Sequence, residues 1–274
     1  MAIALDRDDH DPVAAPRPTR REPAPQETTQ LPAWWREVVV LALLYGLYST
    51  SRLLVRADEA QAVRRGARIF SIEKLLHIDV EPWLNVHVVS IAPLAILACY
   101  AYAALHFTIT PAVLVWARVR HQGRYAIARN HLIVITLIGL CLYWLFPTAP
   151  PRLIGAPFVD AMARFADHGW WAGTSSTPAS VSHLTNEFAA FPSLHFAWAL
   201  WCGWWMQLSS RRWVRVMGAA YPVVVAVVVI VTANHYLLDV VAGGVVFIVA
   251  RLAVEPLARR SSGSSELVAM GSAS

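Results

Sequence analysis

Repeated apolar stretches are the feature that most limits what this chain can fold into. Each is near the ~20 residues that a helix needs to cross the hydrocarbon core of a bilayer. The whole chain agrees, because 57% of its residues are hydrophobic and only 15% are charged, which is too apolar for a water-soluble domain of this size. We predict an all-α bundle of six transmembrane helices, at residues 34–54, 86–108, 130–147, 192–209, 213–233 and 236–254.

The second stretch leaves two alternatives open. Its apolar character continues through Pro111 to Trp116, so residues 86–118 form either one long kinked helix or two segments. A seventh crossing would reverse the orientation of the first helix.

The two ends of the chain differ from the region between them. Residues 1–31 are rich in Pro and in charged residues and lack an apolar run, which predicts a disordered cytoplasmic tail. The first apolar run begins near Trp34 and is long enough to remain as an anchor, so no cleavable signal peptide is expected. We therefore predict one transmembrane domain over residues 32–256 and a second disordered tail over 257–274.

Two connectors stand out. Segment 56–85 carries apolar residues at helical spacing and predicts an amphipathic helix at the membrane surface, with a solvated connector helix as the alternative. Segment 148–191 is rich in Pro, Gly, Ser and Thr, and loops of this length usually carry function. The apolar positions of the first connector are Ala60, Val63, Ala67, Phe70 and Leu75.

Basic clusters predict the orientation. They precede the third span and follow the fourth and sixth, and such clusters usually face the cytoplasm. This places both termini inside and loop 148–191 outside, although the basic connector 56–85 then lies on the unfavoured side. The clusters are Arg118, Arg120, Arg124 and Arg129, then Arg211, Arg212 and Arg215, then Arg259 and Arg260. The expected location is the cell membrane, with multiple crossings.

Composition also limits cofactors and partners. The three cysteines, Cys99, Cys141 and Cys202, lie in apolar runs without metal-ligand spacing, so neither a disulfide framework nor a zinc site is expected. The net charge of +5 suits anionic headgroups better than nucleic acid. No cofactor is therefore predicted, and the oligomeric state is left open.

Polar residues converge at three predicted span ends on one face of the membrane: 146–152, 191–195 and 234–239. His235 and Asp239 are four residues apart at the start of a helix, so the carboxylate can hold one imidazole nitrogen while the other attacks. A histidine oriented in this way is a competent nucleophile toward phosphorus.

Three further residues complete a phosphoryl-transfer site. His195 is placed to protonate the departing oxygen, and no metal is needed for this chemistry. Arg152 and the helix start around Ser193 offer positive charge and hydrogen-bond donors to a phosphate. The alternative, purely structural roles are a helix cap for Ser193 and an interfacial anchor for Arg152.

These segments resemble a known family. Phe-Pro-Ser-Leu-His at 191–195 and Asn-His-Tyr-Leu-Leu-Asp at 234–239, followed by Ala-Gly at 242–243, look like the second and third signature segments of the type 2 phosphatidic acid phosphatase superfamily. Pro-Pro-Arg at 150–152, together with Tyr48 and Arg52, resembles the branch that contains inositol phosphorylceramide synthases.

The resemblance, which covers roughly residues 40–254, implies roles for individual residues. It makes His235 the nucleophile, Asp239 its partner and His195 the acid or base, with Ser193 and Arg152 in the phosphate cradle. It also implies six helices and metal independence.

Two departures indicate that the phosphate cradle is built differently from that of the ordinary phosphatases. These phosphatases carry a lysine-containing first segment and an arginine six residues before the nucleophile. Here Lys74 is the only lysine and Val229 occupies the arginine position, so Arg152 and Arg52 are the candidates to compensate.

Other polar residues are left outside the predicted site. Isolated histidines at helix ends are more often interfacial than catalytic, and acidic residues in loops are usually solvated. The residues set aside are His87, His106, His121, His131, His168, His183, Glu73, Glu81, Asn186 and Glu187.

The sequence thus predicts a metal-independent membrane enzyme, either a phosphatase or a phosphotransferase. Its substrate would be a lipid-linked phosphate or pyrophosphate, its intermediate a phosphohistidine, and its acceptor water or a polyol. The resemblance to the inositolphosphotransferase branch favours transfer. A non-catalytic protein that binds or transports lipid phosphate, and a structural subunit of a larger envelope assembly, are the alternatives from other classes.

Overall fold

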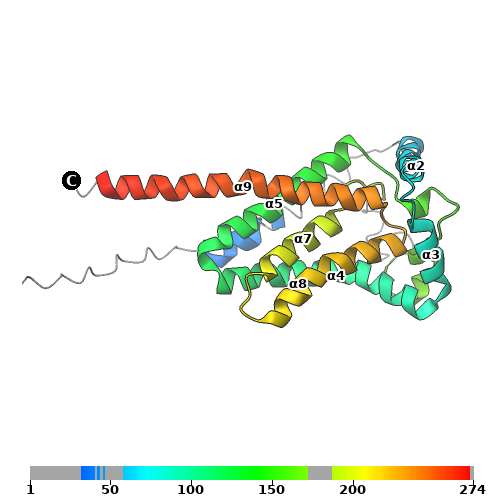
Figure 1. Cartoon of the computed structure of the whole chain (residues 1–274), viewed down its shortest axis with the longest axis horizontal. Coiled ribbons are helices and arrows are strands. Elements are labelled where there is room, and N and C mark those ends of the chain that lie inside the picture. Colours follow the sequence, from blue (N-terminus) through cyan, green and yellow to red (C-terminus); the bar gives the residue numbers. More distant parts are fainter. Residues whose placement is uncertain (1–31, 41, 44–45, 47–57, 172–186, 272–274) are drawn as a thin grey trace, which may run out of the picture. The chain divides into compact units, whose positions relative to one another are not determined.

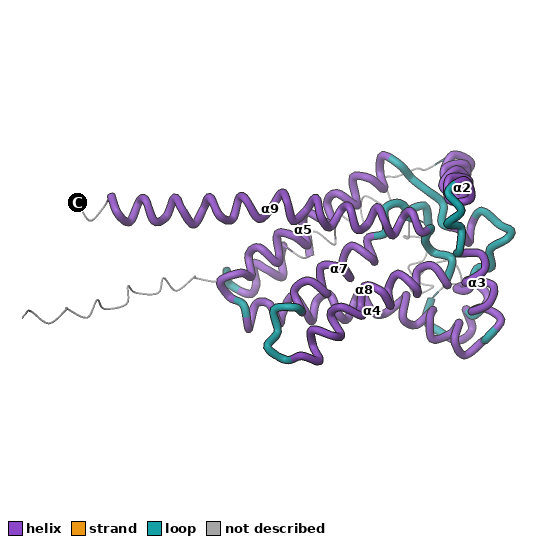
Figure 2. Tube along the Cα trace, viewed as in Figure 1, coloured by secondary structure: helices purple, strands orange, loops and turns teal. Residues whose placement is uncertain are grey.

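The computed structural model describes residues 32–40, 42–43, 46, 58–171 and 187–271, with side chains as far as residue 256. These residues form helices joined by short loops, and no strand occurs among them apart from an isolated bridge between Thr148 and Ala189 (Figures 1 and 2). The predicted all-α class is confirmed for the part of the chain described.

Four helices are long and apolar enough to cross a membrane. They are α4 (Ala92–Arg120), α5 (Gln122–Leu145), α8 (Arg212–Val231) and the first 20 residues of α9 (Leu237–Gly271). The fourth predicted span corresponds to α7 (Leu194–Met206), whose 13 residues are about 20 Å long. The first predicted span, 34–54, lies partly outside the described residues. Six crossings therefore remain a prediction.

The apolar region 86–118 forms parts of two helices. Residue 86 lies in α3 (Glu81–Ser90), and α4 begins after a break at Ile91, whose backbone angles, φ −106° and ψ 86°, are not helical. The predicted start of the second span at residue 86 is therefore wrong. Pro111 lies inside α4 and does not end it. Beyond the break at Ile91 the region is one long helix, which is the first of the two alternatives, and no second segment begins near the proline.

The predicted helix in the connector 56–85 is present as α2 (Glu59–Leu75). Asp58 caps the start of this helix, since its carboxylate accepts the N–H of Gln61 at 3.2 Å. The structure thus contains a helix where the apolar spacing predicted one. The face that packs on the rest of the protein is a different one from the apolar face that was predicted to lie on the membrane.

The buried face of α2 carries Ala62, Gly66, Phe70 and Glu73. Of the predicted apolar positions only Phe70 is buried. Small residues explain the difference, because a Cβ at Gly66 would lie 2.5 Å from the carbonyl oxygen of Ala149, so this face permits a close approach that a larger side chain would prevent. The helix therefore packs on the protein through Ala62, Gly66 and Phe70 rather than through the other predicted apolar positions.

The described part of loop 148–191 packs on the same end of the helices as α2. It contains the short elements η1 (Pro151–Leu153), α6 (Ala161–Arg164) and η2 (Ala166–His168). The backbone N–H of Arg152 donates to the carbonyl oxygen of Ala233 at 2.9 Å, just before α9 begins. These contacts fix the loop against the chain segment that carries His235.

Helix α9 extends further than the sequence predicted. It runs to Gly271, whereas a disordered tail was expected over 257–274 (Figure 1). Pro256 does not end the helix, and several residues beyond it are good helix formers, such as Leu267 and Ala269. The part of α9 that meets the length and hydropathy of a membrane span ends at Pro256.

Helix α7 packs against α4, α5, α8 and α9. Trp201 is fully buried in it and donates its indole N–H to the carbonyl oxygen of Ala128 at 3.0 Å. A Cβ at Gly203 would lie 2.4 Å from the carbonyl oxygen of Gly218, so glycine allows α7 and α8 to approach closely. Being enclosed by neighbours, α7 can be apolar on every side.

Two adjacent glycines of α9 provide a test of this packing. A Cβ at Gly243 would lie 2.4 Å from the carbonyl oxygen of Ser193, whereas one at Gly244 would make ordinary contacts with Phe196 at 3.6 Å and Leu200 at 3.8 Å. We expect Gly243→Ala to lower the free energy of unfolding by about 1–3 kcal/mol. Gly244→Ala, the matched control, should be neutral or stabilising. Thermal unfolding in detergent, followed by tryptophan fluorescence, measures both; equal effects would contradict the close approach of α7 and α9.

Candidate active site

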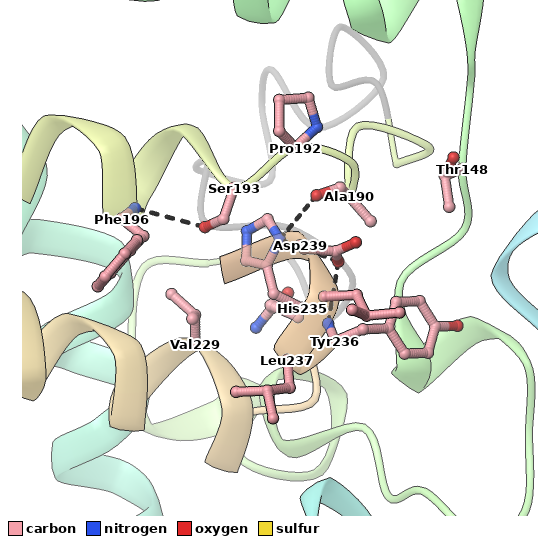
Figure 3. A network of polar contacts seen from close by, with 12 residues as sticks. Thr148, Ala190, Pro192, Ser193, Phe196, Val229, His235, Tyr236, Leu237 and Asp239 are labelled. Atoms are coloured by element: carbon pink, nitrogen blue, oxygen red, sulfur yellow. Dashed lines mark hydrogen bonds and ion pairs between the residues drawn. The ribbon is translucent and has the colours of Figure 1, made fainter. Parts of the chain in front are cut away.

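The starts of α7 and α9 meet at one end of the helices (Figure 3). The backbone N–H of Ser193 donates to the carbonyl oxygen of Asp239 at 3.0 Å. Ser193 also caps α7, since its hydroxyl accepts the N–H of Phe196 at 3.4 Å. This bond directly joins the segments 191–195 and 234–239, which are 39 residues apart in sequence.

His235 lies in the turn between α8 and α9. The backbone N–H groups of Asn234 and His235 both donate to the carbonyl oxygen of Val229, at 3.0 and 3.1 Å, and Ala233 adopts a positive φ of 55°. This turn directs the imidazole back toward the start of α7 (Figure 3). Val229, which occupies the position of the arginine in the ordinary phosphatases, thus contributes its backbone carbonyl as a hydrogen-bond acceptor.

A backbone carbonyl fixes the tautomer of His235. Its Nδ1 lies 2.8 Å from the carbonyl oxygen of Ala190 and 3.4 Å from Oδ2 of Asp239. Because a carbonyl oxygen only accepts, Nδ1 carries the proton and Nε2 keeps its lone pair. The carbonyl of Ala190 is the nearer partner, so Asp239 is not the sole group that orients the ring.

The surroundings of His235 keep it uncharged. It is 2% exposed, and burial lowers its pKa to about 4; the nearby Arg152 guanidinium acts in the same direction, against the Ala190 carbonyl. At neutral pH the imidazole is therefore neutral and Nε2 is free to attack.

His195 lies opposite, at the second position of α7. Its ring centroid is 5.7 Å from that of His235, and its Nε2 has no hydrogen-bond partner within the described structure. Two rings from α4 pack against it: Tyr102 at 4.7 Å and His106 at 4.4 Å between centroids. The imidazole is thus held by aromatic contacts while one nitrogen is left for another partner.

Arg152 lies beside the segment that contains His235 and is nearly buried. Its Nε donates to Oδ1 of Asn234 at 3.1 Å, and its NH1 donates to Oδ2 of Asp160 at 3.2 Å. Asn234 directly precedes His235, so the guanidinium is anchored one residue from the imidazole. The carboxylate of Asp160 offsets part of its charge.

The structure brings together all five predicted site residues, His235, His195, Asp239, Ser193 and Arg152. The roles assigned to them remain predictions. Two other candidates are placed elsewhere or lie outside the described residues: Lys74 extends over the ring of Phe70 on α2 at 4.3 Å, and Arg52 is among the residues not described.

Four residues near the site were missed or set aside at the sequence level. Asp160 and His106 carried no motif, and Glu73 and Glu81 were set aside as solvated. The last expectation is wrong, because both glutamates are fully buried and accept backbone N–H groups at the start of α9. The only sequence feature that could have indicated a structural role for these glutamates was their position near the predicted ends of helices.

The PAP2 superfamily model matches residues 67–253, which is more than half of the chain and includes every residue of this cluster. The chain belongs to the PAP2 superfamily. Membership supports phosphatase or phosphotransferase activity on a phosphate-containing substrate, and the apolar helices support a multi-pass membrane protein. No curated protein and no solved structure gave a significant match.

The aromatic contact between His106 and His195 can be tested by substitution. Phenylalanine at position 106 would keep the ring against His195, whereas alanine would leave a cavity into which the imidazole can move. We expect His106→Ala to lower the turnover of a phosphate substrate roughly tenfold or more, and His106→Phe to retain most of it. Steady-state rates measure both. If the phenylalanine variant is as impaired as the alanine variant, a nitrogen of His106 is needed and the packing role is excluded.

Proposed function

We propose that this PAP2 superfamily member is a membrane enzyme that transfers the phosphoryl group of a lipid-linked phosphate or pyrophosphate through a phosphohistidine on His235. The observation that carries the proposal is the hydrogen bond from His235 Nδ1 to the carbonyl oxygen of Ala190. It leaves Nε2 unprotonated on a buried ring that faces a second histidine.

The first half of the reaction forms the covalent intermediate. Nε2 of His235 attacks phosphorus, the bond from phosphorus to the lipid oxygen breaks, and His195 gives its proton to the departing oxygen. The incoming phosphate brings negative charge, which favours the protonated form of the neighbouring imidazole. Ala190 and Asp239 stabilise the Nδ1–H of the phosphorylated ring, on which positive charge develops.

In the second half, His195 accepts a proton from water or from an alcohol, and the resulting oxygen attacks the phosphohistidine. The bond from phosphorus to Nε2 breaks, and His235 returns to its neutral tautomer. The two half-reactions share one geometry, so the acceptor determines whether the enzyme is a phosphatase or a phosphotransferase.

The phosphate cradle combines Arg152 with the start of α7. Arg152 presents a planar guanidinium that is already fixed by Asn234 and Asp160. The first N–H groups of α7 lack intrahelical partners and lie beside Ser193, so they favour an anion there. Together they supply the positive potential that transfer of a phosphoryl group requires.

Transfer to a polyol is the form of the reaction that we favour. The Pro-Pro-Arg segment at 150–152 resembles the inositolphosphotransferase branch, and its arginine lies at the site. In the orientation expected from the basic clusters, the site opens away from the cytoplasm, in the cell membrane, where a lipid headgroup and a soluble polyol can both reach it.

The direct test compares wild type with His235→Ala on a panel of lipid phosphates, with and without inositol, in the presence of a chelator. We expect loss of turnover by about 10³-fold or more in the variant, and acid-labile phosphate on the wild-type protein alone. Free phosphate identifies a phosphatase and a new phospho-polyol identifies a transferase. His87→Ala, at an exposed histidine of α3, is the control. Turnover that survives in His235→Ala would refute the mechanism, and wild type that binds lipid phosphate without turnover would identify a binding protein.

The role of His195 predicts a dependence on the leaving group. An alkyl leaving group needs a proton, whereas a nitrophenolate leaves without one. We expect His195→Ala to slow release from an alkyl phosphate by ~10²–10⁴-fold and to slow release from p-nitrophenyl phosphate far less. His235→Ala should abolish both reactions. Single-turnover rates measure the contrast, and an equal defect of His195→Ala on both substrates would contradict proton donation by His195.

A further inference from the structure

The first turn of α9 is closed by three buried carboxylates. The N–H of Tyr236 donates to Oδ2 of Asp239 at 2.9 Å, that of Leu237 to Oε1 of Glu81 at 2.7 Å, and that of Leu238 to Oε1 of Glu73 at 2.7 Å. These N–H groups have no partner within a helix, so each carboxylate satisfies one of them. Glu73 comes from the end of α2 and Glu81 from the start of α3, so three separate elements meet at this turn.

The three carboxylates at this turn have few positive charges near them. All three carboxylates have no exposed surface, and none of the ion pairs within the described structure involves Glu73 or Glu81. The dipole of α9 offers only about half a positive charge. Three negative charges buried together with so little compensation would be strongly unfavourable. At least one proton must therefore be held among them.

The unpartnered oxygens indicate where that proton lies. Oε2 of Glu73, Oε2 of Glu81 and Oδ1 of Asp239 are buried without a hydrogen-bond partner, while the other oxygen of each accepts from the start of α9. Glu73 and Glu81 come from different elements and meet at consecutive residues of this turn. The two side chains lie close together, because they accept the N–H groups of the consecutive residues Leu237 and Leu238. A single proton between the Oε2 atoms of the two glutamates satisfies both atoms and removes one charge. No group of three metal-ligating side chains suited to a metal ion occurs in the described part of the chain.

We propose that Glu73 and Glu81 share one proton and act together as positioning residues that fix the first turn of α9. Through this turn they set the position of Asp239 and of His235, which precedes it. The inference rests on the proposed function for its effect on turnover, but the shared proton itself is a property of the folded protein and can be measured without any substrate. Burial raises the pKa of Glu73 to about 8, with the charges of Glu81 and Asp239 acting in the same direction, which agrees with a retained proton.

Glutamine provides a discriminating substitution. In Glu73→Gln the amide oxygen can accept the N–H of Leu238 and the amide nitrogen can donate to Glu81, so the amide replaces the shared proton. The same holds for Glu81→Gln with the partners exchanged. In the double variant two amide NH₂ groups face each other, and one of them must abandon its bond to α9. Leucine at position 73 removes the acceptor altogether.

The experiment uses the full chain in detergent and measures thermal unfolding and phosphate turnover for each variant. We expect each glutamine variant to keep at least about a third of wild-type turnover, and the double variant to fall roughly tenfold below the product of the two single effects. Glu73→Leu should lose turnover and stability together. Glu59→Gln, on the exposed face of α2, is the matched control and should behave as wild type.

The pH dependence of stability adds a readout that does not need turnover. The groups that face Glu73 are Glu81 of α3, Asp239 of α9 and Tyr236 before it; Lys74 lies over the ring of Phe70 and Arg152 is paired with Asp160. Because the folded pKa of Glu73 is above its ordinary 4.5, stability falls as pH rises from 4.5 to about 8 and then levels. Glu73→Gln should remove that part of the slope.

The outcomes separate the inference from the proposed function. Near-additive effects of the two glutamine substitutions, or an unchanged pH slope in Glu73→Gln, would overturn the shared proton even if wild type turns over lipid phosphate. Wild type without turnover would refute the proposed function, while a non-additive loss of stability would still support the proton. Loss of activity in both single variants combined with sensitivity to chelator would replace the proton with a bound cation.

Discussion

The hydrogen bond from the N–H of Ser193 to the carbonyl oxygen of Asp239 joins the two halves of the site. His195 is two residues beyond Ser193 on α7, and His235 is one helical turn before Asp239, so this single bond relates the two imidazoles. It forms only because Gly243 lets α9 approach the backbone of α7. The close helix packing elsewhere, at Gly203 and Gly218, holds α7 in the orientation that this bond requires. Packing between apolar helices thus sets the relative position of the two histidine side chains.

Several charged groups are buried at the same end of the protein. A helix start with free N–H groups normally attracts an anion, and a phosphate would compete for it. At α9 these groups are already taken by Glu73, Glu81 and Asp239, whereas the start of α7 is capped only by the hydroxyl of Ser193. Under the proposed function, this arrangement directs a phosphate toward α7 and Arg152, and α9 serves as a rigid base for His235.

The sequence predicted the helical class, the helix in segment 56–85 and the convergence of five site residues. These features could be predicted because apolar runs, and motifs at the ends of helices, are patterns of residues that are close together in the sequence. It did not predict the buried face of α2, since small residues such as Ala62 and Gly66 carry no hydropathy signal and are selected by their fit to Ala149 and Tyr236. It assigned Glu73 and Glu81 to solvent, because their partners are backbone N–H groups more than 150 residues away. It placed the second span too early, since the break at Ile91 leaves no mark in an apolar window.

Under the proposed function, the position of Arg152 explains how phosphoryl transfer can persist with an altered phosphate cradle. Val229 occupies the place where the ordinary phosphatases carry an arginine, and its carbonyl instead holds the turn that contains His235. The positive charge comes from loop 148–191, where Arg152 is anchored by Asn234 and Asp160. A phosphate that binds there must compete with Asp160 for the guanidinium, so the free site stays close to neutral in a region of low dielectric. When a phosphate reaches His235, its negative charge can replace that of Asp160 beside the guanidinium. Arg152 is then available to the substrate without ever having been buried as an unpaired cation.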